Sequence, residues 1–391
     1  MSFDYVHERK GTRSVKWDLI KAIYGSDEVL PLWVADMDFQ TPQPVIDSLV
    51  DRSKHGIFGY TITDTTINNT IIDWLYRRHD WEINKSWLLY SPGVVSTLHT
   101  AVQALTKPGD SILIQTPVYP PFYNIVKNHD RNLVTNSLKL VNNSYEIDFE
   151  DFEEKLRLGV KAFILCNPHN PAGRVWTKEE LTKMGELCLK YDVKIFSDEI
   201  HADLVYSNQK HIPIGLLSKE INEQTITCMS PTKTFNLAGL QVSYAVIPNT
   251  KDRDLIKDFF NSQGIYMLNT MGISALEAAY KYGESWLEEL LSILEENRDL
   301  VTRSFKDRDE INIIEPEGTY LVWMDCRGLG LKNEELKKFM ANKAKVGLND
   351  GVSFGEESDG FMRMNIACPK AVLKDGIDRI ITALDNYNKS N

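Results

Sequence analysis

The stretch Thr225-Ile226-Thr227-Cys228-Met229-Ser230-Pro231-Thr232-Lys233 decides the fold of this chain. Its first five residues are apolar or β-branched, as in a strand buried within a sheet, and a serine and a lysine follow. Ligands of open α/β sheets bind at the carboxyl ends of strands. A lysine amine placed there can form a Schiff base and a nearby serine can hold a phosphate, which raises the question of a pyridoxal phosphate (PLP) site.

The region around this stretch alternates short β-rich runs with helical segments. The runs lie at 111–114, 133–135, 162–166, 193–196, 226–229 and 242–247. Several are apolar throughout, as strands covered on both faces are. A capping box, Thr177 with Glu180, marks the start of one intervening helix. The pattern predicts an α/β fold with a mostly parallel sheet.

The pattern changes after residue 250. A long helical stretch at about 284–308 is followed by a strand at 320–325 and an amphipathic helix at about 372–384. We therefore expect a large PLP-binding domain over residues 46–283 and a smaller α+β domain over residues 284–391. The segment 1–45 has aromatic residues but little periodicity, and we expect it to pack with the small domain.

Composition narrows the class of protein. The chain has 391 residues, 42% hydrophobic and 25% charged, with a formal net charge of -11. That charge disfavours nucleic-acid and anionic-membrane partners. The charged first ten residues lack the apolar core of a signal peptide, and no apolar stretch approaches the ~20 residues of a membrane helix. Five scattered cysteines fit neither a disulfide framework nor a zinc site, which favours the reducing cytoplasm.

Polar residues follow several of the predicted strands. Asp198 comes after 193–196 and suits a pyridinium nitrogen, although a capping role is the commoner use of aspartate. Asn170, in a loop with two prolines, can donate to a phenolate or a carboxylate, or the loop is simply a rigid turn. Gly93 opens a helix whose amino end suits a phosphate, or is an ordinary helix start.

Two further side chains suit a flat, anionic ligand. Tyr119, near Pro117 and Pro120, can stack on a ring, or is a packed loop aromatic. Arg363 lies in a β-like alternation and suits bidentate binding of a carboxylate, or forms a surface salt bridge.

Together these motifs resemble fold-type-I PLP enzymes over essentially the whole chain. More narrowly, they resemble the MalY/PatB-type cystathionine β-lyases, which are C–S lyases of the class I/II aminotransferase superfamily. The stretches that carry the resemblance are 33–39, 58–60, 91–95, 116–122, 167–174, 197–204, 230–236 and 363–369.

The resemblance implies a seven-stranded sheet and a role for each matching residue. Lys233 is the implied Schiff-base lysine and catalytic base, Asp198 the pyridinium partner, and Tyr119 the ring stacked on the cofactor. The implied cofactor-binding residues are Lys233, Asp198, Asn170, Tyr119, Gly93, Val94, Val95, Ser230, Thr232, His201 and Tyr60. The implied substrate-binding residues are Arg363, Asn170, Tyr60, Ala35 and Tyr320.

The implied reaction is the elimination of a thiol from an L-cysteine S-conjugate, such as cystathionine, with release of pyruvate and ammonia. The implied assembly is a homodimer with shared sites, in which Tyr60 reaches the phosphate bound by the neighbouring subunit. The S-substituent stays open at this point.

Two positions depart from the aminotransferase pattern. Aminotransferases tend to have a tyrosine where this chain has His201, and a phosphate-binding arginine where it has Gln241. Both differences favour the C–S lyase branch over an aminotransferase, the alternative with the same fold. What replaces the arginine is left open by the sequence.

Two motifs are also compatible with chemistry that does not use PLP. Ser230-x-x-Lys233 matches a serine acyl-enzyme motif, but the Ser-Asp-Asn and Lys-Thr-Gly motifs expected later in the chain do not follow. His201, Asp203 and His211 superficially match a two-histidine, one-carboxylate metal set. We expect these three to be solvated loop residues, and no metal site.

Overall fold

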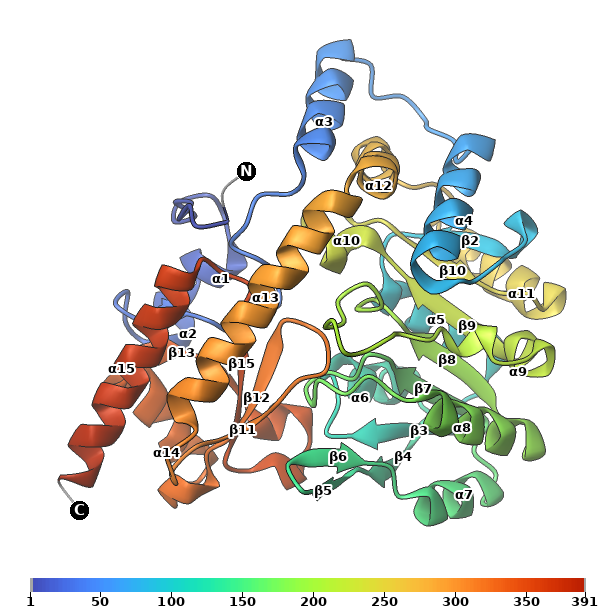
Figure 1. Cartoon of the computed structure of the whole chain (residues 1–391). Coiled ribbons are helices and arrows are strands. Elements are labelled where there is room, and N and C mark those ends of the chain that lie inside the picture. Colours follow the sequence, from blue (N-terminus) through green and yellow to red (C-terminus); the bar gives the residue numbers. More distant parts are fainter. Residues whose placement is uncertain (1–2, 390–391) are drawn as a thin grey trace.

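The computed structural model describes residues 3–389 (Figure 1), so Met1 and Ser2 of the charged start lie outside the described residues. Its centre is a seven-stranded sheet in the order β2-β10-β9-β8-β7-β3-β4. The strands are β2 (Leu88–Ser91), β3 (Ser111–Thr116), β4 (Asn132–Ser137), β7 (Ala162–Cys166), β8 (Lys194–Asp198), β9 (Thr225–Met229) and β10 (Ser243–Val246). β10 runs opposite to the other six strands, so its pairings with β2 and β9 are antiparallel and the remaining pairings are parallel. The predicted mostly parallel, seven-stranded sheet is confirmed.

Helices cover both faces of this sheet because its strands are apolar on both sides. Along β7, Phe163 and Leu165 pack against α8 (Lys178–Lys190), while Ala162 and Ile164 belong to the core on the opposite face. The helices of that opposite face are α5 (Val94–Leu105), α6 (Pro121–Lys127) and α11 (Thr250–Ser262). The predicted capping box of Thr177 and Glu180 opens α8.

The chain after residue 284 builds a second, four-stranded sheet in the order β11-β12-β15-β14. Its strands are β11 (Asn312–Ile314), β12 (Leu321–Asp325), β14 (Asn349–Asp350) and β15 (Phe361–Asn365). The long helix α13 (Glu284–Phe305) and the final helix α15 (Lys370–Asn388) pack on this part of the molecule. The predicted helix–strand–helix order is present, with α13 ending three residues earlier than expected.

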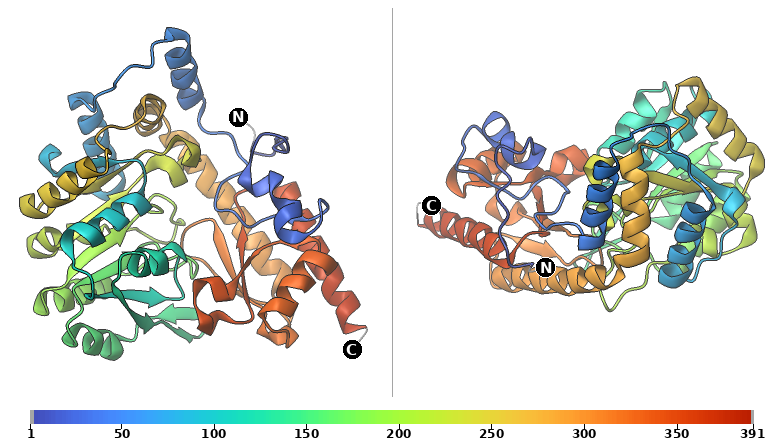
Figure 2. Two further views of the ribbon diagram at one scale, coloured as in Figure 1. Left: turned by 180° about the vertical axis from the view of Figure 1, so that it is seen from behind. Right: turned by 90° about the horizontal axis from the view of Figure 1, so that it is seen from above.

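The N-terminal segment lies against the C-terminal part, as Figure 2 shows for the dark-blue chain beside the orange and red elements. Its short strand β1 (Leu30–Pro31) pairs in parallel with β13 (Val346–Gly347). Phe3, Leu32 and Met37 join one apolar core with residues of α13 and α15. The domain limits 1–45, 46–283 and 284–391 stay a prediction, since this core is continuous across them.

Other helices between β1 and α13 include α3 (Gln43–His55), α4 (Thr65–His79) and α12 (Thr270–Tyr282), and α12 packs against both α3 and α4. Within residues 3–389, no helix is both long and apolar enough to cross a membrane.

The carboxyl ends of β2, β3, β7, β8 and β9 meet at one edge of the large sheet, and each is followed by a motif singled out above.

Candidate active site

A cavity of about 430 Å³ opens at this edge of the sheet, a size suited to a small ligand. Its walls come from the N-terminal segment, the start of α5, the loops after β3, β7 and β8, and α10 (Pro231–Thr234) with the turn after it. The predicted site residues among its lining are Ala35, Gly93, Val94, Val95, Tyr119, Asn170, Asp198, His201, Thr232 and Lys233. Residues scattered over two hundred positions are thus brought together.

Lys233 lies in the short helix α10, directly after the buried strand β9. Its amine donates to the carbonyl oxygen of Ala35 at 2.6 Å. Burial of the amine and the nearby Arg363 guanidinium lower the pKa of Lys233 to about 8, against the opposing pull of Asp36 and Asp198. A lysine with a pKa of about 8 is neutral in about a tenth of the molecules at pH 7, a few hundred times more often than an ordinary lysine, and a neutral amine is both a nucleophile and a base.

Asp198 ends β8 and lies in the same cavity. Its carboxylate accepts from the backbone N–H of Ile200 at 3.2 Å, so the capping use weighed for this residue is present as well. Burial raises the pKa of Asp198 to about 7, although the Ile200 N–H and Lys233 oppose the rise. A cationic ring nitrogen beside this carboxyl would restore its charge, because opposite charges favour each other's ionised forms.

The amino end of α5 forms another wall of the cavity. Gly93 is its N-cap and offers no side-chain hydrogen bond to the first turn. The first backbone N–H groups of a helix lack partners within the helix and carry the positive end of its dipole. This end of α5, with Val94 and Val95 in its first turn, therefore suits an anion such as a phosphate.

The two hydroxyls predicted to share that phosphate differ in their surroundings. Thr232 lines the cavity. The Ser230 hydroxyl accepts from the Thr232 N–H at 3.0 Å and donates to the Val242 carbonyl at 2.7 Å, which makes it the N-cap of α10. Ser230 thus shapes the turn that presents Lys233, and its contact with phosphate stays a prediction.

Arg363 projects from β15 behind the cavity. The guanidinium donates to the Asn170 side-chain oxygen at 2.9 Å, to the Asn349 side-chain oxygen at 2.8 Å and to the Trp33 carbonyl at 3.2 Å. The surface-salt-bridge alternative is wrong, because Arg363 is buried and these partners are neutral. Its Nε has no hydrogen-bond partner among the described residues. Burial lowers the pKa of Arg363 to about 10, as expected for a cation that lacks an anionic partner.

Three rings surround the Lys233 amine. Tyr119 lines the cavity, and burial followed by the Asp198 charge raises its pKa. His201 is buried with its ring edge toward Tyr320, and burial, Lys233 and Arg363 lower the pKa of His201 to about 3. His201 Nδ1 lacks a partner within residues 3–389. The Tyr320 hydroxyl donates to the same Ala35 carbonyl as Lys233, at 2.9 Å.

Tyr60 lies outside this cavity, in an extended segment between α3 and α4, and its side chain is 93% exposed. Ile57, Phe58 and Ile62 beside it are exposed as well. In the single chain Tyr60 therefore contacts none of the residues described above, and its predicted role depends on a second subunit.

The cavity also contains residues that the sequence analysis did not assign: Pro92, Ser96, Cys166, Ile200, Ala238 and Val242. Gln241, at the place of the missing arginine, lines the cavity too. Asn349 was missed as a partner of Arg363. Several of these residues directly precede or follow a predicted site residue, so their position next to a motif could have identified them. Asn349 is remote from every motif, and no sequence signal could have identified it.

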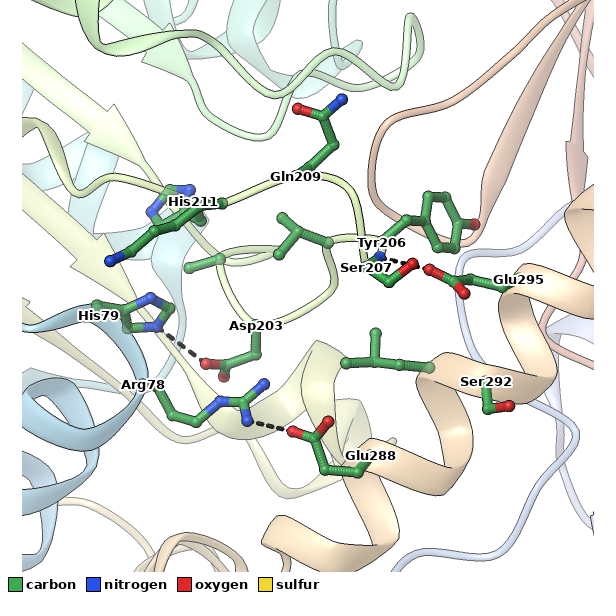
Figure 3. A pocket seen from close by; sticks show the side chains of 14 residues that line it. Arg78, His79, Asp203, Tyr206, Ser207, Gln209, His211, Glu288, Ser292 and Glu295 are labelled. Atoms are coloured by element: carbon green, nitrogen blue, oxygen red, sulfur yellow. Dashed lines mark hydrogen bonds and ion pairs between the residues drawn. The ribbon is translucent and has the colours of Figure 1, made fainter.

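A second cavity of about 400 Å³ contains Asp203 and His211 of the metal alternative (Figure 3). Asp203 accepts from Thr234 and pairs with His79 at 3.0 Å, while His211 pairs with Glu199 at 2.8 Å. The expectation that His201, Asp203 and His211 are solvated is wrong, because all three are buried. Their polarity suggested exposure, but Asp203 and His211 have buried partners, although His211 Nδ1 has none within residues 3–389. Within residues 3–389, no cluster of three or more suitable ligands could hold a metal ion.

The serine acyl-enzyme alternative lacks its defining contact. Lys233 donates to Ala35 and Ser230 donates to Val242, so the two side chains turn to different partners. A lysine that activates a serine must hydrogen-bond with it.

Comparison with known proteins identifies the class. The chain belongs to the aminotransferase class I and II family, whose model matches residues 27–380. The fold is that of the fold-type-I PLP-dependent enzymes.

Among its relatives, the cystathionine β-lyase PatB of Bacillus subtilis (strain 168) is 43% identical over 386 residues, covering 98% of this chain and all of PatB. The PLP-bound crystal structure of a Clostridium difficile 630 protein, provisionally called an aminotransferase, is 47% identical with a TM-score of 0.96 and covers 98% of this chain and 99% of that one. Cystalysin from Treponema denticola, whose crystal structure contains PLP, is 35% identical with a TM-score of 0.96 and the same coverage of both chains.

Proposed function

We propose that this chain is a PLP-dependent C–S β-lyase that converts an L-cysteine S-conjugate and water into a thiol, pyruvate and ammonia. One observation carries the proposal: a lysine amine with a pKa lowered to about 8 shares a cavity with a buried carboxyl, Asp198, and with an uncapped helix start at Gly93. The full-length similarity to a cystathionine β-lyase supports the same reaction.

The residues present fit PLP. The cofactor needs an amine for its aldehyde, an anion for its ring nitrogen and donors for its phosphate. Lys233, Asp198 and the first turn of α5 supply these three in one cavity, and Tyr119 offers a ring for stacking. Asn170 and the unpartnered His201 lie in the same wall and are the candidates for polar contacts with the ring. When bound, PLP supplies an electron sink for charge that develops at the substrate Cα.

The side chains then divide the work of elimination. Lys233 Nζ takes the proton from Cα as general base. Asp198 keeps the ring nitrogen protonated, which favours the developing negative charge. A thiolate leaves from Cβ; its conjugate acid has a pKa of about 8.5, so it needs little help from an acid.

Arg363 is the proposed ligand of the substrate carboxylate. It is a buried cation whose Nε lacks a partner within the described chain, and it already touches Asn170 in the cavity wall. A carboxylate can bind two N–H groups of a guanidinium at once, which fixes its orientation. Ala35 and Tyr320, linked through the Ala35 carbonyl, complete the proposed substrate side of the cavity.

An aminotransferase remains the second candidate, since one solved relative is provisionally given that activity. His201 and Gln241, which stand where aminotransferases tend to have tyrosine and arginine, favour the lyase. The proposal specifies the cysteine part of the substrate and leaves the group attached to its sulfur unassigned.

We also propose that the chain acts as a cytoplasmic homodimer with shared sites. Four large apolar side chains are exposed close together in sequence, Ile57, Phe58, Tyr60 and Ile62, and such a stretch suits burial against a second copy. Tyr60 would then reach the phosphate held in the neighbouring subunit. The five cysteines are free and buried, which fits a reducing compartment.

A panel of S-substituted L-cysteines tests the proposed function. Cystathionine, cysteine and thioethers with larger apolar groups are ranked by kcat/KM, with thiol and pyruvate measured in the same samples. We expect thiol and pyruvate in equal amounts from the preferred substrate. Amino transfer to an added keto acid, without thiol release from any member of the panel, would favour the aminotransferase.

A further inference from the structure

The segment 33–39, here called the strap, connects the groups around Lys233 through its backbone. The Trp33 carbonyl accepts from Arg363, and the Ala35 carbonyl accepts from both Lys233 and Tyr320. The proposed catalytic amine and the proposed carboxylate ligand thus touch the same short piece of backbone, two residues apart. A shift of the strap would move the partners of both side chains together.

Two asparagines hold the strap from the protein side. Asn236, three residues after Lys233, accepts from the Met37 N–H and donates to the Met37 and Phe39 carbonyls. Asn365, two residues after Arg363, donates to the Val34 and Asp36 carbonyls at 2.6 Å each. The strap is therefore fixed to β15, which contains Arg363, and to the turn directly after α10, which contains Lys233.

An ionic cluster holds the strap from its other side. Arg9 pairs with Asp36 at 2.8 Å and with Asp38 at 2.6 Å. Lys16 pairs with Asp38 at 2.6 Å and approaches Asp36 at 3.7 Å. The two acids flank Met37 on the strap, and both cations come from the N-terminal segment.

This cluster is too deeply placed for an ordinary surface contact. The Lys16 side chain is 0% exposed, and the Trp17 indole N–H adds a third donor to Asp38 at 2.9 Å. Burial alone would raise the pKa of Asp38, but Lys16, Trp17 and Arg9 together hold it below its usual value. A buried ion pair contributes little net stability, whereas removal of one partner leaves an uncompensated buried charge, which is strongly destabilising. Such a pair fixes geometry more than it stabilises the fold.

We propose that Arg9 and Lys16 are positioning residues that act through the strap: by holding Asp36 and Asp38, they place the Ala35 carbonyl against the Lys233 amine and offset the Asp36 charge beside it. The proposal deepens the proposed function, because it rests on Lys233 as the reactive amine.

The charges that face Lys233 come from every element around it. Asp198 from β8 and Asp36 from the strap favour the ammonium form, while Arg363 from β15 disfavours it, and burial is the largest influence. His201, Tyr119, Tyr320 and Cys166 are further titratable groups in or beside this cavity, and the pKa shifts of all four favour their neutral forms. Asp36 is therefore one of two anions acting on the amine, and Arg9 is the cation that pairs with it most closely.

Because Arg9 and Asp36 have opposite charges, their removal should shift the pKa of Lys233 in opposite directions, which provides a test. Full-length protein, freed of cofactor, is methylated with formaldehyde and cyanoborohydride at a series of pH values, and modification of Lys233 is measured by peptide mass spectrometry. The rate follows the neutral amine and gives its apparent pKa. Arg9→Met should raise that pKa by about half a unit, because Asp36 loses its counter-charge; Asp36→Asn should lower it by about as much.

Both substituted side chains are partly exposed, at 22%, so these variants avoid leaving the buried Lys16 unpaired. Arg9→Lys should restore the wild-type value, and Arg308→Met, which breaks a separate pair with Asp385, should leave it unchanged. Thermal unfolding checks that each variant is folded. Shifts of the same sign for Arg9→Met and Asp36→Asn, or no shift beyond that of Arg308→Met, would overturn the proposal. The measurement reads the amine itself, so it remains interpretable if the lyase assay fails.

Discussion

The cavity around Lys233 and the second cavity in Figure 3 have similar sizes, about 430 and 400 Å³, and both contain buried acids and histidines. In the second cavity most of these groups pair with one another: His79 with Asp203, His211 through its Nε2 with Glu199, and Arg78 with Glu288, and His211 Nδ1 is the one buried lining atom without a partner among the described residues. Around Lys233 they do not. Among the described residues, Arg363 Nε and His201 Nδ1 have no hydrogen-bond partner. The side chain of Asp198 accepts a hydrogen bond from the backbone N–H of Ile200.

The difference separates structural from functional polarity. Buried polar groups that pair with each other have their hydrogen bonds satisfied within the fold and need no ligand. Buried polar groups without hydrogen-bond partners destabilise the fold, and a ligand with complementary charges and hydrogen-bonding groups can offset that cost. We therefore place the proposed chemistry in the cavity around Lys233, and we interpret the second cavity as a mostly paired structural cluster.

The largest effect is expected at Lys233. Lys233→Ala removes both the amine that bonds the cofactor and the proposed general base, which alone contributes about 10²–10⁴ in rate. Thiol release should fall to background, and the visible absorption of bound cofactor should change. The measurement is thiol release together with the absorption spectrum. Substantial PLP-dependent turnover by the variant would remove Lys233 from the mechanism.

Asp198→Asn should reduce kcat by about a hundredfold or more, since a pre-placed charge at the ring nitrogen is lost. It should also alter stability without cofactor. The pKa of Asp198 is about 7 in the folded chain, above the ordinary aspartate value of 3.8, so the stability that its neutral carboxyl contributes is full below about pH 4 and is lost as the pH rises through 7.

Thermal unfolding of the cofactor-free protein between about pH 4 and pH 8 measures this difference. The wild type should lose stability over the range more steeply than Asp198→Asn. Parallel curves for the two proteins would show that Asp198 is ionised in the folded chain throughout.

Arg363→Ala should mainly raise KM for amino-acid substrates, by about tenfold or more, because a charged hydrogen bond to the carboxylate is lost. Arg363→Lys keeps the charge without the two-pronged geometry and should recover only part of the affinity. Steady-state kinetics of both variants provide the comparison. An unchanged KM in Arg363→Ala would assign the carboxylate to another residue.

The smallest effect on catalysis is expected in the second cavity. His79→Phe removes the partner of Asp203 while keeping a ring, and should lower the free energy of unfolding by about 1–3 kcal/mol. Its kcat/KM should stay within about twofold of the wild type, a smaller change than the loss of one hydrogen bond to the substrate would cause. Denaturant unfolding and kinetics measure the two quantities. A large catalytic loss in a folded variant would erase the distinction between the cavities.

The parts of the site that the sequence predicted are local ones. Lys233, Asp198 and Gly93 each stand next to an apolar run whose strand or helix is readable from a few residues, and the shared edge of a parallel sheet then brings them together. The antiparallel direction of β10 was not readable, because its apolar run is the same in either direction.

The parts that were missed depend on distant contacts. Burial of Arg363 among amide oxygens depends on Asn170, 193 residues away, and on Asn349. The polarity of Asp203 and His211 suggested exposure, since their partners His79 and Glu199 are revealed only by the fold. The cluster of Arg9, Lys16, Asp36 and Asp38 was likewise unreadable as a unit.

The most direct test is product analysis with purified protein, PLP and L-cystathionine. The account predicts that thiol, pyruvate and ammonia form in equal amounts without an added keto acid, and that Lys233→Ala forms none. Amino transfer that requires a keto acid, with no thiol released from cystathionine or from other cysteine thioethers, would contradict it.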